Sequence, residues 1–197
     1  MKELVKLVLA LTLVSVIAGA LLSITQKCTA EPIRLAEQRQ LMDSLRKVLP
    51  PAEGDPLVLT LPAADGGSNT FYVARKGGAL AGVAFSCSSP NGYGGPVEAL
   101  VGLTPDGVIH GLGIKQKETP GLGTKIAADA FVNQFIGKPL DGPAWKVTKD
   151  GGSVDAVSGA TISSRALCDA ISNGLKIYQD NRQAILAAAA VPAAPAP

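Results

Sequence analysis

A long apolar run opens the chain. Residues 7–24, LVLALTLVSVIAGALLSI, hold 18 positions without a charge, between Lys6 and Lys27. About 20 apolar residues span a bilayer, whereas the apolar core of a cleaved signal peptide has about 7–15. The length favours an uncleaved transmembrane anchor over residues 1–27. A cleaved signal peptide stays open, because Cys28-Thr29-Ala30 could serve as a late cleavage site.

Residues 28–50 change to a helical alternation of apolar and polar positions. One face collects apolar side chains at helical spacing: Leu41, Met42, Leu45, Val48 and Leu49. Thr29 can cap this helix, Pro32 is tolerated in a first turn, and Pro50-Pro51 ends it. The pattern predicts a separate juxtamembrane amphipathic helix that docks on the domain after it.

Short apolar runs cut by Gly, Asp and Pro then follow. LVLTL, NTFYVAR and ALAGVAFS, which begin at Leu57, Asn69 and Ala79, are typical of strands. VEALVGL and VIHGLGI flank a Pro105-Asp106-Gly107 turn, which predicts a β-hairpin. AWKVTKD, ending at Asp150, predicts a further strand.

Two helices are predicted in the second half of the chain. The first covers TKIAADAFVNQFIG, with Thr124 as its cap and Ile126, Phe131, Phe135 and Ile136 on roughly one side. The second starts near Thr161 and repeats apolar or small residues at Leu167, Ala170, Ile171, Gly174, Leu175 and Tyr178. Residues 186–197 read as a low-complexity Ala/Pro tail. We therefore expect an α+β fold: an N-terminal transmembrane helix, then one domain over residues 51–185 with a mostly antiparallel sheet flanked by helices.

Charge and cysteine content narrow the function classes. A formal net charge of +2 provides no electrostatic basis for binding nucleic acid. The chain has three cysteines without CxxC spacing and a single histidine, His110, so it cannot easily build a zinc or iron–sulfur site. A Cys87–Cys168 disulfide stays open for an exported domain, although the odd number of cysteines speaks against a disulfide framework.

Small hydroxyl and glycine residues gather just ahead of the last predicted helix, in DAVSGATISS, residues 155–164. Ser158, Gly159, Ala160 and Thr161 are expected in the turn that leads into this helix. A helix N-terminus carries free N–H groups and a partial positive charge, which favour a phosphate. On spacing alone, an ordinary Ser/Thr helix cap is the simpler explanation, and an anion pocket containing a nucleophile-capable hydroxyl is the alternative.

Two further glycine-rich loops precede this motif. In KETPGLGTKI, Thr119-Pro120-Gly121 should turn tightly, and Gly121 and Gly123 permit close approach of a ligand, although the order of residues is not that of a Walker loop. In SSPNGYGGP, Tyr93 stands among glycines, where an aromatic side chain can flank a planar ring. Three such loops suit a large planar ligand that also carries a phosphate.

These motifs together resemble a known family. DAVSGAT is similar to the recognition motif of proteins with covalently bound FMN, an Asp, two variable residues, Ser or Thr, then Gly-Ala-Thr, and GYGGP and KETPGLG precede it in that family's order. With the anchor, the pattern most resembles the G subunits of the Rnf ion-translocating electron-transport complex. The C subunits of the sodium-pumping NADH:quinone reductase share the domain in a generally longer chain. The similarity runs from the anchor through Tyr178.

The resemblance implies where FMN is held. Thr161 would carry it through a phosphoester, attached by a flavin transferase with FAD as donor, and Asp155 would belong to the transferase's recognition pattern. Ser158, Gly159 and Ala160 would lie at the phosphate. Further flavin contacts are expected at Tyr93, Glu118, Thr119, Gly121, Leu122 and Gly123. Gln116 stands where many relatives have histidine, so no imidazole role is carried over, and His110 is expected to be an ordinary strand residue.

The implied protein is an electron-carrying subunit without catalytic residues of its own. It would sit in the bacterial inner membrane by a single span, with its domain on the periplasmic side, although the lysines beside the span barely decide the orientation. Its partners would be membrane subunits with iron–sulfur or flavin centres, in a complex that couples ferredoxin and NAD redox to ion movement. The alternatives are the same domain in a quinone reductase or another periplasmic electron chain, and an anchored scaffold module without flavin.

Overall fold

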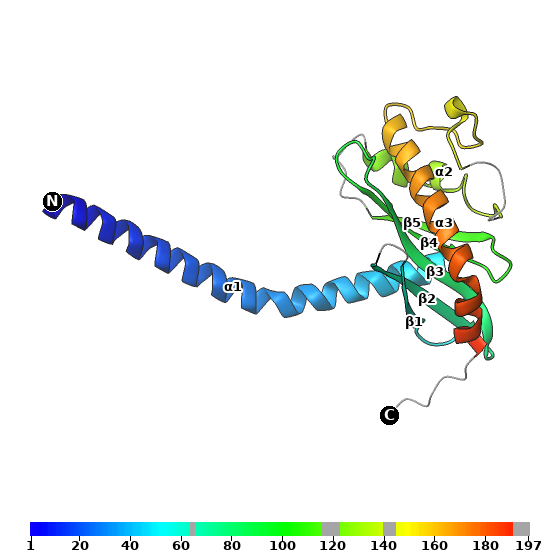
Figure 1. The fold of residues 1–197 in the computed structure, drawn as a ribbon, viewed down its shortest axis with the longest axis horizontal. Helices are drawn as coiled ribbons and strands as arrows, with labels where there is room; N and C mark the ends of the chain where they lie inside the picture. The colour runs from blue at the N-terminus through cyan, green and yellow to red at the C-terminus, as the bar shows by residue number, and fades with distance from the viewer. Residues whose placement is uncertain (64–65, 116–122, 140–144, 191–197) are drawn as a thin grey trace. The chain divides into compact units, whose positions relative to one another are not determined.

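The computed structural model describes residues 1–63, 66–115, 123–139 and 145–190 (Figure 1). The chain divides into two compact units, Met1–Asp43 and Ser44–Pro197. The first unit consists of helix α1, Lys2–Val48, whose last residues belong to the second unit. The second unit holds a five-stranded sheet and the helices packed on it.

Helix α1 has the composition of a membrane span. Within the described residues it is the one helix both long and apolar enough to cross a bilayer, with an 18-residue window of mean hydropathy 2.6 that is not buried by the protein. The hydroxyls of Thr12, Ser15 and Thr25 each donate to the carbonyl four residues earlier, at 2.8, 2.9 and 2.9 Å. These bonds satisfy the hydroxyls inside the helix, as a hydrocarbon environment requires. The expected anchor is thus present as a helix.

The predicted start of a second helix near Thr29 is wrong, because α1 continues without a break and contains Pro32. Thr29 Oγ1 donates to Thr25 O at 2.8 Å, so its hydroxyl bonds back along the helix and caps nothing. Residues 26–31 contain no glycine or proline that would end the helix ahead of Pro32. The helix ends at Val48, two residues before Pro50, as expected.

All five strands of the sheet match predicted apolar runs. They are β1 (Leu57–Pro62), β2 (Ser68–Lys76), β3 (Ala79–Ser89), β4 (Val97–Leu103) and β5 (Ile109–Lys115). Each strand pairs antiparallel with the next, in the order β1-β2-β3-β4-β5. In the hairpin turn Gly107 N donates to Thr104 O at 2.9 Å, and Gly107 has φ 81°, a conformation that suits glycine. The predicted β-hairpin is confirmed.

Helix α3, Thr161–Ala190, lies across one face of this sheet (Figure 1). All six positions that repeat at helical spacing from Leu167 to Tyr178 are buried, as predicted. Phe85 of β3 lies between two rings, with centroids 6.0 Å from Phe71 and 5.9 Å from Tyr178. Val83, Phe85 and Cys87 of β3 therefore face the helix, and they form the core together with their partners on β2 and β4.

The end of α1 packs on the opposite face of the sheet. Leu45, Val48 and Leu49 are buried, as the amphipathic pattern predicts. Val48 lies against Gly102 and Gly111, which pair across β4 and β5, and a Cβ on either glycine would collide with the Val48 backbone. Glycine is required at these two positions by the close approach of the helix end.

Two predicted elements differ from the structure. Residues 124–137 do not form one helix: a 3-10 helix, η1 (Gly123–Ala127), is followed by α2 (Asp129–Val132), and Gly137 has φ 78°. Thr124 lies inside η1, and Ala128 precedes α2 without a side-chain cap, so no hydroxyl starts a longer helix there. Ile126, Phe131 and Phe135 are buried as expected, whereas Ile136 is 41% exposed.

The predicted strand ending at Asp150 is also wrong. Val147 makes a single parallel bridge to Val154, and Thr148–Asp150 turn as a 3-10 helix, η2. Gly151, with φ 81°, reverses the chain too early for a strand to extend. At the other end, α3 continues to Ala190, because alanine favours helix and because Ile185 and Ala189 are buried. The predicted tail therefore keeps only residues 191–197, which lie outside the described residues.

The glycine pair under Val48 generates the first prediction. We expect Gly102→Ala to destabilise the folded domain by about 1–3 kcal/mol, because the added methyl must displace the Val48 backbone. Gly113→Ala is the matched control, since its Cβ would lie 3.5 Å from Val48 Cγ1, an ordinary contact. The measurement is thermal unfolding of the full chain in detergent, followed by fluorescence of its single tryptophan, Trp145. Equal midpoints for the two variants would contradict this packing.

The buried thiols generate the second prediction. Cys87 and Cys168 are free in the structure, and burial raises the pKa of each thiol to about 12. Since the thiolate is the reactive form, neither should alkylate in the folded protein at pH 8, whereas exposed Cys28 should. Mass spectrometry after maleimide treatment should find one label on the native chain and three after denaturation. A Cys28→Ser variant that still takes a label when folded would contradict the burial.

Candidate functional site

A tight turn carries the chain into α3. Ala160 N donates to Val157 O at 2.9 Å, and Gly159, the third residue of this turn, has φ 80°. Ser158, the second residue of the turn, does not have a positive φ, because every positive φ among the described residues belongs to a glycine. Without a positive φ at the second residue and with one at the third, the turn fits type II. A side chain at Gly159 would strain the backbone, which explains why the motif needs a glycine there.

The first residues of α3 leave backbone N–H groups free. Ser164 N donates to Ala160 O at 2.9 Å, which makes Ala160 the N-cap residue and Thr161 the first residue inside the helix. Alanine has no side-chain oxygen, so the ordinary Ser/Thr cap considered from the sequence is not present at this position. The N–H groups of Thr161 and Ile162 have no acceptor within the helix, and they sit at the positive end of its dipole.

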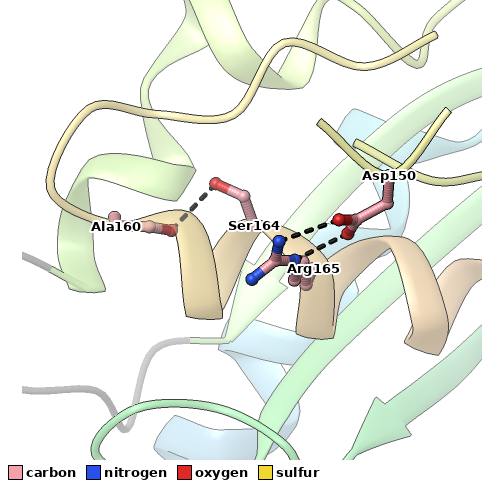
Figure 2. A network of polar contacts seen from close by, with 4 residues as sticks. All are labelled: Asp150, Ala160, Ser164 and Arg165. Atoms are coloured by element: carbon pink, nitrogen blue, oxygen red, sulfur yellow. Dashed lines mark hydrogen bonds and ion pairs between the residues drawn. The ribbon is translucent and has the colours of Figure 1, made fainter. Parts of the chain in front are cut away.

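Ser164 locks the turn onto the helix. Its hydroxyl, fully buried, accepts from Val157 N at 3.1 Å and donates to Ala160 O at 2.9 Å. Figure 2 shows the second of these bonds reaching back from the first turn to the N-cap residue. One side chain thus connects both ends of the turn, and the position of Thr161 follows from it.

The hydroxyl-bearing residues around the turn differ in how far they are exposed. Ser163 and Ser164 are 1% and 0% exposed, so neither can meet another molecule without unfolding. Thr161 is half-buried and Ser158 is exposed. Of these two, only Thr161 lies on the helix that supplies the free N–H groups. Thr161 is the hydroxyl best placed to carry a phosphate at the helix N-terminus.

An ion pair stands one helical turn further on. Arg165 Nε and Nη2 donate to Asp150 Oδ2 and Oδ1 at 2.6 and 2.8 Å (Figure 2). The hydrogen bond from Arg165, followed by its charge, lowers the pKa of the Asp150 carboxyl, so the pair is ionised at neutral pH. Because Arg165 follows Thr161 by four residues, both lie on the same side of α3. The guanidinium of Arg165 is thus held by Asp150 one helical turn beyond Thr161.

Sequence reasoning missed Arg165, although a signal was available. A basic residue in the first turns of a helix opposes the dipole, so it suggests a nearby carboxylate or an anionic ligand. The structure supplies Asp150 as the carboxylate, on a segment that the sequence analysis assigned to a strand.

A second side chain missed by the sequence analysis holds the start of the motif. Gln134 Nε2 donates to Asp155 O at 3.2 Å, and Asp155 N donates to Gln134 Oε1 at 2.7 Å. The side chain of Asp155 remains exposed. The amide therefore fixes the Asp155 backbone and leaves its carboxylate accessible.

The topology brings the start of α3, the loop that carries Tyr93 and the end of β5 to one end of the sheet. Gly174 lies against Cys87 and Tyr178 against Phe85, so α3 runs antiparallel to β3. The loop after β3, which carries Tyr93, therefore lies at the end where α3 begins, and Tyr93 is 67% exposed there. Lys115, the last residue of β5, pairs with Glu98 at this same end.

The remaining predicted contacts are only partly covered. Gly123 is the first residue of η1. Four expected flavin contacts and the position often held by histidine lie outside the described residues: Glu118, Thr119, Gly121, Leu122 and Gln116. His110 is an exposed residue of β5, as expected of an ordinary strand residue.

The Ser164 lock generates the third prediction. We expect Ser164→Ala to cost about 1–3 kcal/mol of unfolding free energy, because the partly buried Val157 N–H loses its acceptor. Hydrogen exchange at Val157 should also become faster. Ser158→Ala, an exposed change in the same turn, should stay within about 0.5 kcal/mol of the unmodified chain. Indistinguishable melting curves and exchange rates for the two variants would contradict the lock.

Comparisons with known proteins match both a domain within the chain and nearly the whole of its length. Residues 92–176 match the model of the FMN-binding domain family, a stretch that starts beside Tyr93 and includes the turn and Thr161. The chain is 39% identical over 189 residues to the G subunit of the ion-translocating oxidoreductase complex of Cereibacter sphaeroides, covering 91% of this chain and 86% of that protein. It is 34% and 36% identical to the proteins of the same name in Pseudomonas aeruginosa and Pseudoalteromonas atlantica, each over 91% of this chain and 90% of the relative.

Identity at this level extends over nearly the whole of each protein and well beyond the stretch matched by the domain model. The chain therefore belongs to the family of G subunits of the ion-translocating oxidoreductase complex, and it contains an FMN-binding domain.

Proposed function

We propose that the protein is the membrane-anchored FMN subunit of an Rnf-type complex and that it carries FMN as a phosphoester on Thr161. One observation carries the attachment site: in DAVSGAT the N-cap is an alanine, and the next residue offers an accessible hydroxyl among free N–H groups. The resemblance of the motif to covalent FMN proteins supports the same residue. The FMN-binding domain and the name of the relatives support the electron-transfer role.

The residues at the turn fit a phosphate. The N–H groups of Thr161 and Ile162 would donate to its oxygens at the positive end of the helix dipole. Gly159 and Ala160 add little side chain between the turn and the phosphate. The bound flavin would supply the electron-transfer chemistry. Tyr93, and the expected contacts over residues 118–123, would surround the ring.

Attachment would be a group transfer without a change of oxidation state. Thr161 Oγ forms a bond to the phosphorus of the FMN half of FAD, and the hydroxyl loses its proton. The pyrophosphate bond of FAD breaks, and AMP leaves. A flavin transferase would catalyse this step, with Asp155 as part of what it recognises. The product is heavier than the unmodified chain by FMN minus one water.

The transmembrane helix and the proposed covalent attachment support a location of the domain outside the cytoplasm. Helix α1 would span the inner membrane once, with the domain on the periplasmic side. A flavin lost there could not readily be replaced, so a covalent bond would keep it in place. The redox partners would be membrane subunits with flavin or iron–sulfur centres, and electrons would pass through FMN to or from them. No small-molecule substrate is required.

The nearest alternative is the same domain in a sodium-pumping quinone reductase. The relatives named for the ion-translocating complex match over 86–90% of their own length, which favours the Rnf-type assignment. A scaffold module without flavin is the other alternative. The turn, the alanine N-cap and the accessible hydroxyl are all intact, and this argues against a decayed site.

The fourth prediction tests the attachment. The full chain made with an active flavin transferase should gain FMN minus one water, with the gain mapped to the peptide that contains Thr161. Thr161→Ala and the nearly isosteric Thr161→Val should show no gain, because each removes the acceptor hydroxyl. Intact-mass spectrometry with peptide mapping is the measurement. Covalent flavin on either variant, or none on the unmodified chain while a control acceptor is modified, would refute the proposal.

A further inference from the structure

We infer that Gln134 is a positioning residue for flavin attachment: it holds the Asp155 backbone so that Asp155 and Thr161 meet the transferase in one arrangement. The inference rests on the proposed attachment of FMN to Thr161. The observation behind it is a pair of hydrogen bonds from one amide side chain to both backbone groups of Asp155, at 2.7 and 3.2 Å.

Gln134 is itself held firmly. It stands between Phe131 and Phe135, which are 3% and 0% exposed, and its own N–H donates to Phe131 O at 3.2 Å. The ring of Phe135 stacks on Trp145 with centroids 5.8 Å apart. The amide therefore projects from a part of the chain that is anchored in the core.

The segment that Gln134 holds has no regular structure of its own. On one side of Asp155, Val154 N donates to Lys146 O at 3.2 Å. On the other side, Val157 N donates to Ser164 Oγ. Between these two points, Gln134 is the partner of both the N–H and the C=O of Asp155. The motif is thus fastened at Asp155 by Gln134 and at the turn by Ser164.

Fixing both points matters for recognition. The exposed Asp155 carboxylate and the Thr161 hydroxyl are six residues apart, and a transferase that reads both needs them in one relative position. A loose Asp155 would leave only a fraction of the chains competent, and the apparent affinity would fall by that fraction. The loss should appear in KM for the acceptor protein, while kcat changes little once the complex has formed.

The test uses the full chain, made without transferase, purified in detergent and incubated with purified flavin transferase and FAD. The initial rate of covalent flavin formation is measured against acceptor concentration. Gln134→Ala removes the amide, and Gln134→Asn keeps the amide on a stem one methylene shorter. We expect both variants to raise KM by about tenfold, since two hydrogen bonds are lost, with kcat near that of the unmodified chain.

Lys138→Ala is the matched control. Lys138 connects the same two stretches of chain through Nζ and Ser153 Oγ, at 3.5 Å and on the exposed surface, and we expect its KM to be unchanged. Hydrogen exchange before modification is the second measurement. The Asp155 amide should be protected in the unmodified chain and in Lys138→Ala, and should exchange faster in both Gln134 variants.

The outcomes separate the inference from the function it rests on. If the unmodified chain takes no flavin at Thr161, the proposed function fails first. If the wild-type chain takes flavin at Thr161 and Gln134→Ala does so with the same KM, the positioning role is refuted. A fall in kcat with unchanged KM, together with a lower melting temperature, would refute it as well, because that pattern indicates a role in general stability.

Discussion

The close packing of α3 on the sheet is the constraint on which the candidate site depends. Gly174 lies over β3, where a Cβ would come within 2.6 Å of Cys87 Cβ and 2.8 Å of Phe85 Cε2. Because glycine has no Cβ, the helix approaches closely enough for Tyr178 to stack on Phe85 and for Leu167 and Ile171 to be fully buried. A helix fixed in this way along its length has a fixed first turn. The packing of α3 on the sheet therefore sets the direction in which the free N–H groups of its first turn point.

Polar side chains also fix the start of α3, in addition to the packing of the core. Arg165 near an N-terminus is unfavourable by itself, and Asp150 offsets it with a bidentate pair. An anion at Thr161 would gain from the helix dipole. Ser164 works from the other side of the same turn, where it is buried and bonds to two backbone groups. The half-buried hydroxyl between them is the one that this arrangement leaves available.

The sequence predicts well those elements that are determined by the spacing of apolar residues and by turn-forming residues. The strands follow from short apolar runs, the hairpin from Pro105-Asp106-Gly107, and the buried face of α3 from its helical spacing. Residues 124–137 and the chain near Asp150 escape such prediction, because they form short 3-10 and α-helical turns that share no single period. Gln134 and Arg165 could not be assigned roles, because their partners, Asp155 and Asp150, are 21 and 15 residues away along the chain. Local propensity favours a helix start near Thr29 with Pro32 in its first turn, whereas α1 continues through both residues.

The irregular path from Asp150 to Ala160 is suited to presenting two groups at once. A strand would alternate its side chains between a buried and an exposed face, and a helix would commit one side to packing. Here the backbone groups are satisfied by side chains, Gln134 at Asp155 and Ser164 at Val157, so the segment needs no ladder of its own. Both Asp155 and Thr161 stay accessible as a result, although the chain that links them is fixed at each end. The proposed attachment of FMN to Thr161 requires both properties, because the segment would have to be accessible to the transferase and then hold the cofactor in place.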